Sequence, residues 1–184
     1  AARFLEGLGH EVEWVTPDIN FLDAYEGQTA AYIMNFSQTI IDLLKQKGLE
    51  QPPEHLVEPM CIRVWEQGRH ASYTDRAAMQ KLFNDVSRKI AAFFGEWDII
   101  LTPTMAKPTP LIGTTEYLTV SDNPSVDDWF ENLWSIFSYT PIANLCGLPG
   151  ISLPMAEMKN GMPFGIQALA KQGADGLLLQ LGAQ

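Results

Sequence analysis

The chain has 184 residues, 46% of them hydrophobic and 18% charged, a composition that excludes an intrinsically disordered protein. Its 22 acidic residues outnumber its 12 lysines and arginines, and the net charge of −10 argues against a nucleic-acid or anionic-membrane partner. No apolar run approaches the roughly 20 residues that a membrane-spanning helix requires. We therefore expect a globular protein that has neither nucleic acid nor membrane among its partners.

The N-terminal part of the chain predicts a helix end, a strand and a long helix, in that order. Apolar residues at helical spacing stop at Gly9, which suits a left-handed helix cap. Val12 and Trp14 alternate with glutamates, a pattern typical of a half-buried strand. From Phe21 onward, apolar residues recur at helical spacing as far as Gly48, so we expect one long helix there.

The next part of the chain predicts two further helices. Pro52-Pro53 is a clear break, and a short amphipathic helix follows it and ends at Gly68. Ser72 and Asp75 have the spacing of a capping box, which is typical of a helix start. Apolar residues at helical spacing then indicate a long helix that ends at Gly95.

A strand, a loop and a short helix are expected next. The apolar run over residues 97–102 has the composition of an interior parallel strand. Residues 103–125 are rich in Pro, Thr and Gly, and a loop of this length in a compact domain is usually functional or mobile. Ser125 and Asp128 form a second capping box, which predicts the start of a short helix.

The C-terminal part predicts a hairpin and a last helix. Residues 151–155 and 164–170 have the composition of strands, and Asn160-Gly161 between them is a strong turn signal. The final helix is expected to start near Asp175. Strands embedded among long helices predict an α/β fold class, in which helices sandwich a mixed β-sheet.

Residues that carry chemistry are few and scattered. None of the eight serines lies in a Gly-x-Ser-x-Gly nucleophile elbow. Ser152 comes nearest, but Pro154 replaces the second glycine, so we expect a strand serine packed in the core. The three histidines stand apart among charged residues, as surface groups do, and no metal or nucleotide spacing is present, so we expect no metal and no cofactor. Two cysteines make no disulfide framework, which favours a reducing, cytoplasmic location.

Two motifs near the C-terminus resemble the end of the amidase signature family of serine hydrolases. They are similar to N-x-x-G-L-P-x-[IV]-S-[LV]-P and to G-x-P-x-G-[IV]-Q. The matching residues are Asn144, Gly147, Leu148, Pro149, Ile151, Ser152, Leu153 and Pro154, then Gly161, Pro163, Gly165, Ile166 and Gln167. Residues 5–12 and 98–104 resemble elements that precede these motifs in the family. The resemblance implies the C-terminal part of an amidase-signature α/β/α fold, from a parent enzyme that cleaves carboxamide C–N bonds.

The same resemblance implies what this sequence lacks. The family's active site resembles a Ser–Ser–Lys arrangement in a Gly- and Ser-rich segment, and the chain has neither a Ser-Ser pair nor a Gly-Gly-Ser stretch. Lys107 and Lys171 have no serine cluster near them in sequence, so no catalytic residue is assigned. We expect residues 1–184 to form a single C-terminal lobe, truncated at both ends, that does not hydrolyse amides alone.

Substrate binding is the role that the resemblance leaves to this part of an amidase. The implied substrate-binding residues are Trp134, Phe137 and Ser138 before the first motif, Thr104 and Met105 after the central strand, and Cys61 and Trp65 on the short helix. Aromatic walls would suit a hydrophobic or aromatic amide. An aromatic stripe at helical spacing is also typical of a core, and that alternative stays open.

Two other functions also stay open. One, in the same family, is a subunit of a tRNA-dependent amidotransferase, against which the acidic charge argues because tRNA phosphates demand a basic surface. The other is a noncatalytic binding module on the same fold. For an amidase, the expected partners are a small-molecule amide substrate and the missing N-terminal part of the same protein. We also expect a homodimer where an apolar face stays uncovered.

Overall fold

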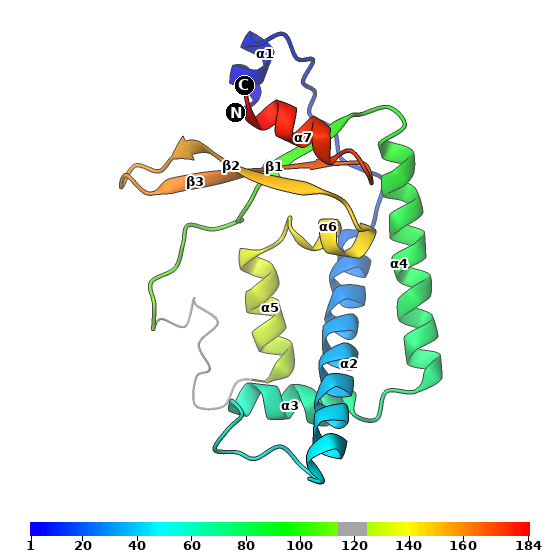
Figure 1. The fold of residues 1–184 in the computed structure, drawn as a ribbon. Helices are drawn as coiled ribbons and strands as arrows, with labels where there is room; N and C mark the ends of the chain where they lie inside the picture. The colour runs from blue at the N-terminus through cyan, green and yellow to red at the C-terminus, as the bar shows by residue number, and fades with distance from the viewer. Residues whose placement is uncertain (114–124) are drawn as a thin grey trace. The chain divides into compact units, whose positions relative to one another are not determined.

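The computed structural model describes residues 1–113 and 125–184, which contain seven helices and three strands (Figure 1). The chain divides into two compact units. The sheet unit comprises Ala1–Asn20, Asp85–Pro108 and Phe137–Gln184, and the helical unit comprises Phe21–Asn84 and Thr109–Ile136. The expectation of a single lobe over residues 1–184 stays a prediction.

The N-terminal segment of the sheet unit has the predicted helix but not the predicted strand. Helix α1 spans Ala2–Gly7, and Gly9 has a φ of 95°, in the left-handed region that glycine tolerates. The strand expected at Val12 and Trp14 is wrong, because residues 11–17 form no strand. Alternating side chains make a strand only where a partner supplies backbone hydrogen bonds, and no described strand pairs with this segment. Trp14 is consequently 94% exposed, while Val12 packs against the core of the sheet unit.

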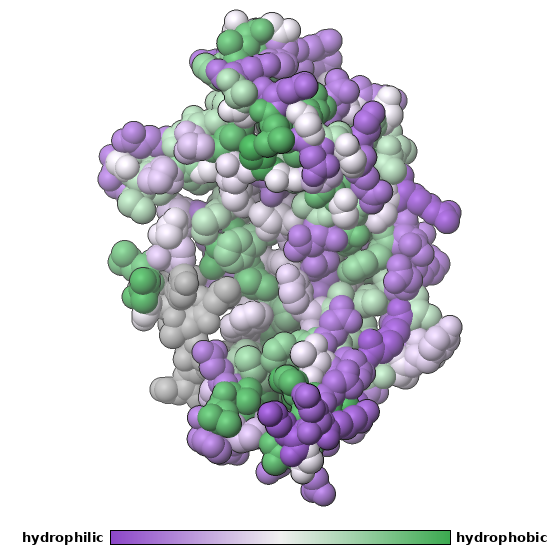
Figure 2. Space-filling view, in the orientation of Figure 1, coloured by the Kyte–Doolittle hydropathy of each residue, from purple (hydrophilic) through white to green (hydrophobic). Residues whose placement is uncertain are grey.

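Four helices build the helical unit. They are α2 (Phe21–Lys47), α3 (Pro59–Gly68), the first part of α4 (Tyr73–Phe93) and α5 (Val126–Ile136). The three helices predicted to end at Gly48, Gly68 and near Gly95 are therefore confirmed. Figure 2 shows hydrophilic residues along much of α4, as expected for the solvent face of an amphipathic helix. Among the described residues, no helix combines the length and the apolar character needed to cross a membrane.

The capping box predicted at Ser72 forms with both of its hydrogen bonds, and the Ser125 hydroxyl of the second caps the start of α5. The Asp75 carboxylate accepts a hydrogen bond from the Ser72 backbone N–H at 2.7 Å, and Ser72 Oγ accepts one from the Asp75 N–H at 3.2 Å. At the start of α5, Ser125 Oγ accepts a hydrogen bond from the Asp128 N–H at 3.0 Å. These bonds occupy backbone N–H groups that lack a partner within the helix. The loop predicted over residues 103–125 falls in part on residues 114–124, which lie outside the described residues.

Helices α2 and α3 pack closely at a small-residue contact. Ser37 of α2 is fully buried, and its Oγ donates a hydrogen bond to the Val64 carbonyl of α3 at 3.0 Å. Gly68 makes this approach possible, because a Cβ there would meet Ser37 Oγ and would lie 2.6 Å from the Ile33 carbonyl oxygen. Buried side chains of α2, α3 and α5, Phe130 among them, complete the core beside this contact.

The sheet has three strands in the order β1-β3-β2. They are β1 (Ile99–Pro103), β2 (Gly150–Glu157) and β3 (Pro163–Ala170). The hairpin predicted at Asn160-Gly161 is confirmed, with Gly161 at a φ of 80° between β2 and β3. The prediction of an interior parallel strand at residues 97–102 is wrong, because β1 pairs with β3 alone among the described strands, and antiparallel. An apolar strand composition reports burial on both faces and carries no information on strand direction, and both described pairings are antiparallel.

One face of this sheet carries the core of the sheet unit. Side chains of all three strands pack there with Leu5 of α1 and with Leu178 and Leu181 of α7 (Asp175–Gly182), and Figure 1 shows α7 lying along the sheet. The last helix predicted near Asp175 is therefore confirmed.

The short helix α6 (Pro141–Cys146) was not predicted, because six residues are too few to show a helical period. Two residues in the sequence mark the ends of this helix. Pro141 lies in its first turn, and Gly147, with a φ of 62°, follows its last residue.

Candidate substrate-binding residues

A polar row crosses the face of the sheet opposite the apolar core. The strand register places Thr102 of β1 and Ser152 of β2 on either side of Gln167 of β3. Directly paired residues of antiparallel strands point to the same face, so these three side chains form one line across the sheet. The neighbouring positions Ile100 and Leu169 are apolar, and the polar character is therefore confined to one end of this face.

A pair of hydroxyl groups extends the polar row beyond the end of β1. Thr104 Oγ1 and Ser152 Oγ lie 2.6 Å apart, within hydrogen-bond distance. Gly165 of β3 makes room for them, because a Cβ there would lie 2.8 Å from each hydroxyl oxygen. The interpretation of Ser152 as a core serine is wrong, because its side chain is exposed on the face away from the apolar cluster. The partner of its hydroxyl is another hydroxyl, not the base that a nucleophile needs.

Gln167 connects this row to the segment that precedes α6. Its side chain is only 7% exposed, and its Nε2 donates to Thr102 Oγ1 at 3.2 Å and to the Tyr139 carbonyl at 3.4 Å. Gln167 therefore bonds to one side-chain hydroxyl and to one backbone carbonyl. A buried carboxamide without such partners would destabilise the fold, so the two bonds fix both the side chain and the carbonyl.

Four of the predicted substrate-binding residues lie in the sheet unit. Thr104 and Met105 directly follow β1, and both are half-buried. Phe137 and Ser138 are also half-buried and precede Tyr139, the residue whose carbonyl Gln167 holds. Gln167 therefore contacts Thr102, two residues before Thr104, and Tyr139, the residue after Ser138.

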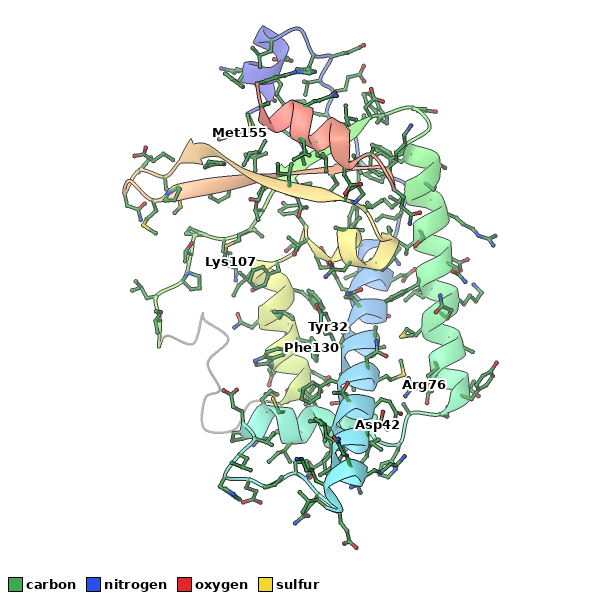
Figure 3. The ribbon with its side chains drawn as sticks, in the orientation of Figure 1. Tyr32, Asp42, Arg76, Lys107, Phe130 and Met155 are labelled. Carbon is green, nitrogen blue, oxygen red and sulfur yellow. The ribbon has the colours of Figure 1, made fainter. Side chains whose placement is uncertain are left out.

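Trp134 lies in the helical unit, in an aromatic cluster of α2 and α5. Its ring stacks on Tyr25 with centroids 6.0 Å apart and lies 6.2 Å from Phe130, and its Nε1 donates to Thr29 Oγ1 at 2.7 Å. Tyr32 reaches toward Phe130 from α2, with ring centroids 6.3 Å apart (Figure 3). The aromatic cluster is not fully buried, since Tyr32 is 45% exposed and Trp134 is half-buried. Trp134 thus has the contacts of a core residue and also the accessible surface that a substrate-binding residue requires.

Cys61 and Trp65 lie on α3 of the helical unit. Burial raises the pKa of the half-buried Cys61 thiol, and the nearby Glu58 carboxylate acts in the same direction. A thiol with a raised pKa stays protonated at neutral pH and is a poor nucleophile. Trp65 is 5% exposed, and the Arg69 guanidinium lies 4.8 Å from the centroid of the Trp65 ring. The Nε1 of Trp65 has no hydrogen-bond acceptor among the described residues.

The remaining ionisable groups do not form a recognisable centre. No three His, Cys, Asp or Glu residues in the described ranges are grouped so that they could hold a metal ion. His10, His55 and His70 are exposed, as expected, and both cysteines are free thiols. Burial also raises the pKa of Cys146, with a hydrogen bond from Ser87 opposing the effect.

The predicted binding set is therefore divided, with Trp134, Cys61 and Trp65 in one unit and the other four residues in the other. Its role in substrate binding stays a prediction. Sequence reasoning did not assign Thr102, Ser152 and Gln167 to one site. The alternation of side chains along each strand shows in the sequence which residues share a face. The strand register, which aligns Thr102, Gln167 and Ser152, cannot be determined from the sequence.

Comparison with known proteins identifies relatives along almost the whole chain. A family model described as Amidase matches residues 1–179. A Mycobacterium tuberculosis protein named as amidase AmiC is 43% identical over 187 residues, which cover 98% of this chain and 36% of the relative. One of the subunits of the Pseudomonas aeruginosa glutamyl-tRNA(Gln) amidotransferase is 30% identical over 165 residues, covering 89% of this chain and 31% of the relative. A solved structure of 6-aminohexanoate cyclic dimer hydrolase matches with a TM-score of 0.83 at 25% identity, covering 99% of this chain and 38% of that chain.

The chain spans about a third of the length of these relatives. The structural match covers α1 through α7 and confirms the predicted α/β fold class of the amidase-signature enzymes. The two motifs that suggested this family lie on α6, β2 and β3, inside the matched range. Because the family model covers residues 1–179 and the fold agrees with it, the chain belongs to the amidase family.

Proposed function

We propose that the protein to which this chain belongs is an amidase that hydrolyses carboxamide C–N bonds with a serine nucleophile. The observation that carries the proposal is the match of residues 1–179 to the Amidase family model. In this proposal the chain supplies scaffold and part of the substrate pocket, while a Ser–Ser–Lys arrangement elsewhere in the protein supplies the chemistry. The 184-residue chain alone then has no hydrolase activity, because an acyl-transfer enzyme needs a nucleophile and its base.

The seven predicted residues are our proposal for the substrate-binding residues that this chain contributes, four from the sheet unit and three from the helical unit. The accessible rings of Tyr32 and Trp134 support a preference for an apolar or aromatic group on a linear amide. The polar row supports contacts to hydrogen-bonding groups, since Thr104 and Ser152 present hydroxyls on an open sheet face. No cofactor is required for this chemistry.

The experiment is a turnover assay of the full-length protein on a panel of aliphatic and aromatic amides, with the isolated 184-residue chain as control. We expect hydrolysis by the full-length protein and none by the chain. Absence of turnover on every amide by the folded full-length protein would contradict the proposal. Trp134→Ala tests the pocket separately, because an unchanged preference between aliphatic and aromatic amides would remove Trp134 from it.

The missing part of the same protein is the partner that we propose for the exposed apolar side chains. Large hydrophobic residues remain open to solvent in both units, including Trp14 at 94%, Leu56 at 74% and Ile112 at 90%. Burial of such side chains stabilises by about 1.5–3 kcal/mol each, which favours a covering segment. A homodimer is the other proposed cover, and light scattering on the full-length protein and on the isolated chain distinguishes the two.

The two free thiols support a reducing, cytoplasmic location.

Membership of a tRNA-dependent amidotransferase is a second candidate function, supported by the relative from Pseudomonas aeruginosa that carries this name. The net charge of −10 on this chain opposes direct contact with tRNA. Co-purification with partner subunits would favour this candidate, whereas amide turnover by the protein alone favours the first. A noncatalytic module is the third, and it requires that the full-length sequence also lacks the Ser-Ser pair and the lysine.

A further inference from the structure

Gln167 lies at the junction of two stretches that the proposed pocket needs. Gln167 lies on β3, and more than nine-tenths of its surface is buried. Strand β1 on one side of it leads into Thr104, and strand β2 on the other side carries Ser152. Both of its Nε2 bonds leave its own strand, one to Thr102 on β1 and one to the Tyr139 carbonyl before α6. A long polar side chain in this position is costly to bury, so the two bonds must offset that cost.

The segment that Gln167 holds lies outside regular structure. Residues 137–140 lie between the end of α5 and the start of α6, and Pro141 has no N–H to offer at the next position. Within the segment, Thr140 Oγ1 donates to the Phe137 carbonyl at 3.3 Å, a local bond that does not reach the sheet. The hydrogen bond from Gln167 joins the segment directly to β3.

We propose that Gln167 is a positioning residue for substrate binding, because its carboxamide fixes Phe137 and Ser138 relative to Thr104. This inference rests on the proposed amidase function. Gln167 itself does not touch the substrate. Loss of its Nε2 donors releases the Tyr139 carbonyl, and the residues before it then sample positions that do not bind the substrate.

The chain offers a matched control for this tether. Gln172 Nε2 donates to the Cys146 carbonyl at 2.8 Å, at the opposite end of the same helix α6. Gln172→Leu therefore removes the same chemical group from the same unit without touching the segment of residues 137–140. A general loss of stability in the sheet unit would affect both variants, whereas positioning of the pocket depends on Gln167 alone.

The experiment measures kcat and KM of the full-length protein, of Gln167→Leu and of Gln172→Leu on the amide that the wild type turns over best. For Gln167→Leu we expect KM to rise about tenfold with kcat changed less than about threefold, the size of effect expected when the hydrogen bond to the Tyr139 carbonyl is lost. For Gln172→Leu we expect KM within about twofold of the wild type. Hydrogen exchange should accelerate at residues 137–140 in Gln167→Leu only. If Gln167→Leu does not fold, Gln167→Met, which keeps the length of the side chain without its donors, replaces it in the same comparison.

The outcomes separate this inference from the function on which it rests. An active wild type with an unchanged KM in Gln167→Leu overturns the positioning role and leaves the amidase in place. Equal increases of KM in both variants also overturn it, because they indicate a general structural effect. A folded wild type that turns over no amide overturns the proposed function and this inference with it.

Discussion

The sheet unit and the helical unit use polar side chains in different ways. In the helical unit the hydroxyl of Ser37 is enclosed between packed helices and bonds to a backbone carbonyl. In the sheet unit Thr104 and Ser152 present their hydroxyls on a face that the apolar core does not use. The comparison indicates that the Ser37 hydroxyl serves packing in the helical unit, whereas the Thr104 and Ser152 hydroxyls of the sheet unit lie outside its apolar core. We therefore expect substitutions in the first to change stability, and substitutions in the second to change binding as well.

The largest effect is expected where the helical unit is most tightly packed. Gly68→Ala places a Cβ against Ser37 Oγ and 2.6 Å from the Ile33 carbonyl, so α2 and α3 must separate. Overpacking of this kind lowers the free energy of unfolding by about 3 kcal/mol. Chemical denaturation of the full-length protein measures the change.

Gly176→Ala in the sheet unit is the control for this substitution, because a Cβ at Gly176 meets nothing within 4 Å. In the first turn of α7 it should be neutral or stabilising by up to about 1 kcal/mol. A loss at Gly68 no larger than the change at Gly176 would contradict the close packing of α2 on α3.

A smaller effect is expected at the hydroxyl pair of the sheet unit. Gly165→Ala places a Cβ 2.8 Å from the oxygens of Thr104 and Ser152 and separates them, at a cost of about 2 kcal/mol in unfolding free energy. Ser152→Ala removes one of the crowded oxygens, so the double variant should lose less than the sum of the two single variants. Strict additivity would show that the methyl group is accommodated without moving the hydroxyls.

These two glycines also illustrate how much of the fold the sequence could predict. Gly68 ended a predicted helix, and that boundary is confirmed, but its contact with Ser37 depends on how two helices cross. Gly165 was recognised only as part of a motif, since its role depends on the Thr104 hydroxyl after β1 and the Ser152 hydroxyl on β2. Periodicity and turn signals locate elements along the chain, whereas close approaches between elements depend on packing that no local pattern encodes.

The candidate site was predictable to a lesser extent for the same reason. The hydrogen bond from Gln167 to the Tyr139 carbonyl could not be predicted, because the two residues are 28 positions apart. The direction of β1 could not be predicted either, since an apolar run is equally typical of a parallel and an antiparallel strand that is buried on both faces. The existence of the hairpin was predictable from one local turn, whereas the register shift between Leu153 and Ala156 was not.

The aromatic cluster gives a third test of the comparison, with a smaller expected effect. Trp134→Phe and Thr29→Val each break the hydrogen bond between Trp134 Nε1 and Thr29 Oγ1, while the stack on Tyr25 is kept. We expect each variant to lose about 1 kcal/mol of unfolding free energy, and the double variant to lose little more, because both remove the same bond. Unfolding curves of the four proteins measure the coupling, and a coupling near zero would assign Trp134 to stacking alone.

The smallest effect is expected at the start of α4, where the charge of an exposed cap can be removed without removing the cap. Hydrogen bonds from the Ser72 side chain and backbone lower the pKa of Asp75, so its carboxylate stabilises the fold at any pH above about 4, the ordinary value. That contribution disappears as the pH falls through the lowered pKa of the folded state, where wild-type Asp75 becomes neutral. Asp75→Asn is neutral throughout and can still accept a hydrogen bond from the Ser72 N–H. The small stability advantage of the wild type over the variant should therefore be constant near pH 7 and shrink below pH ~4 in acid unfolding curves. An advantage that grew on acidification would require the carboxyl group to be favoured in its protonated form, contrary to the bonds it accepts from Ser72.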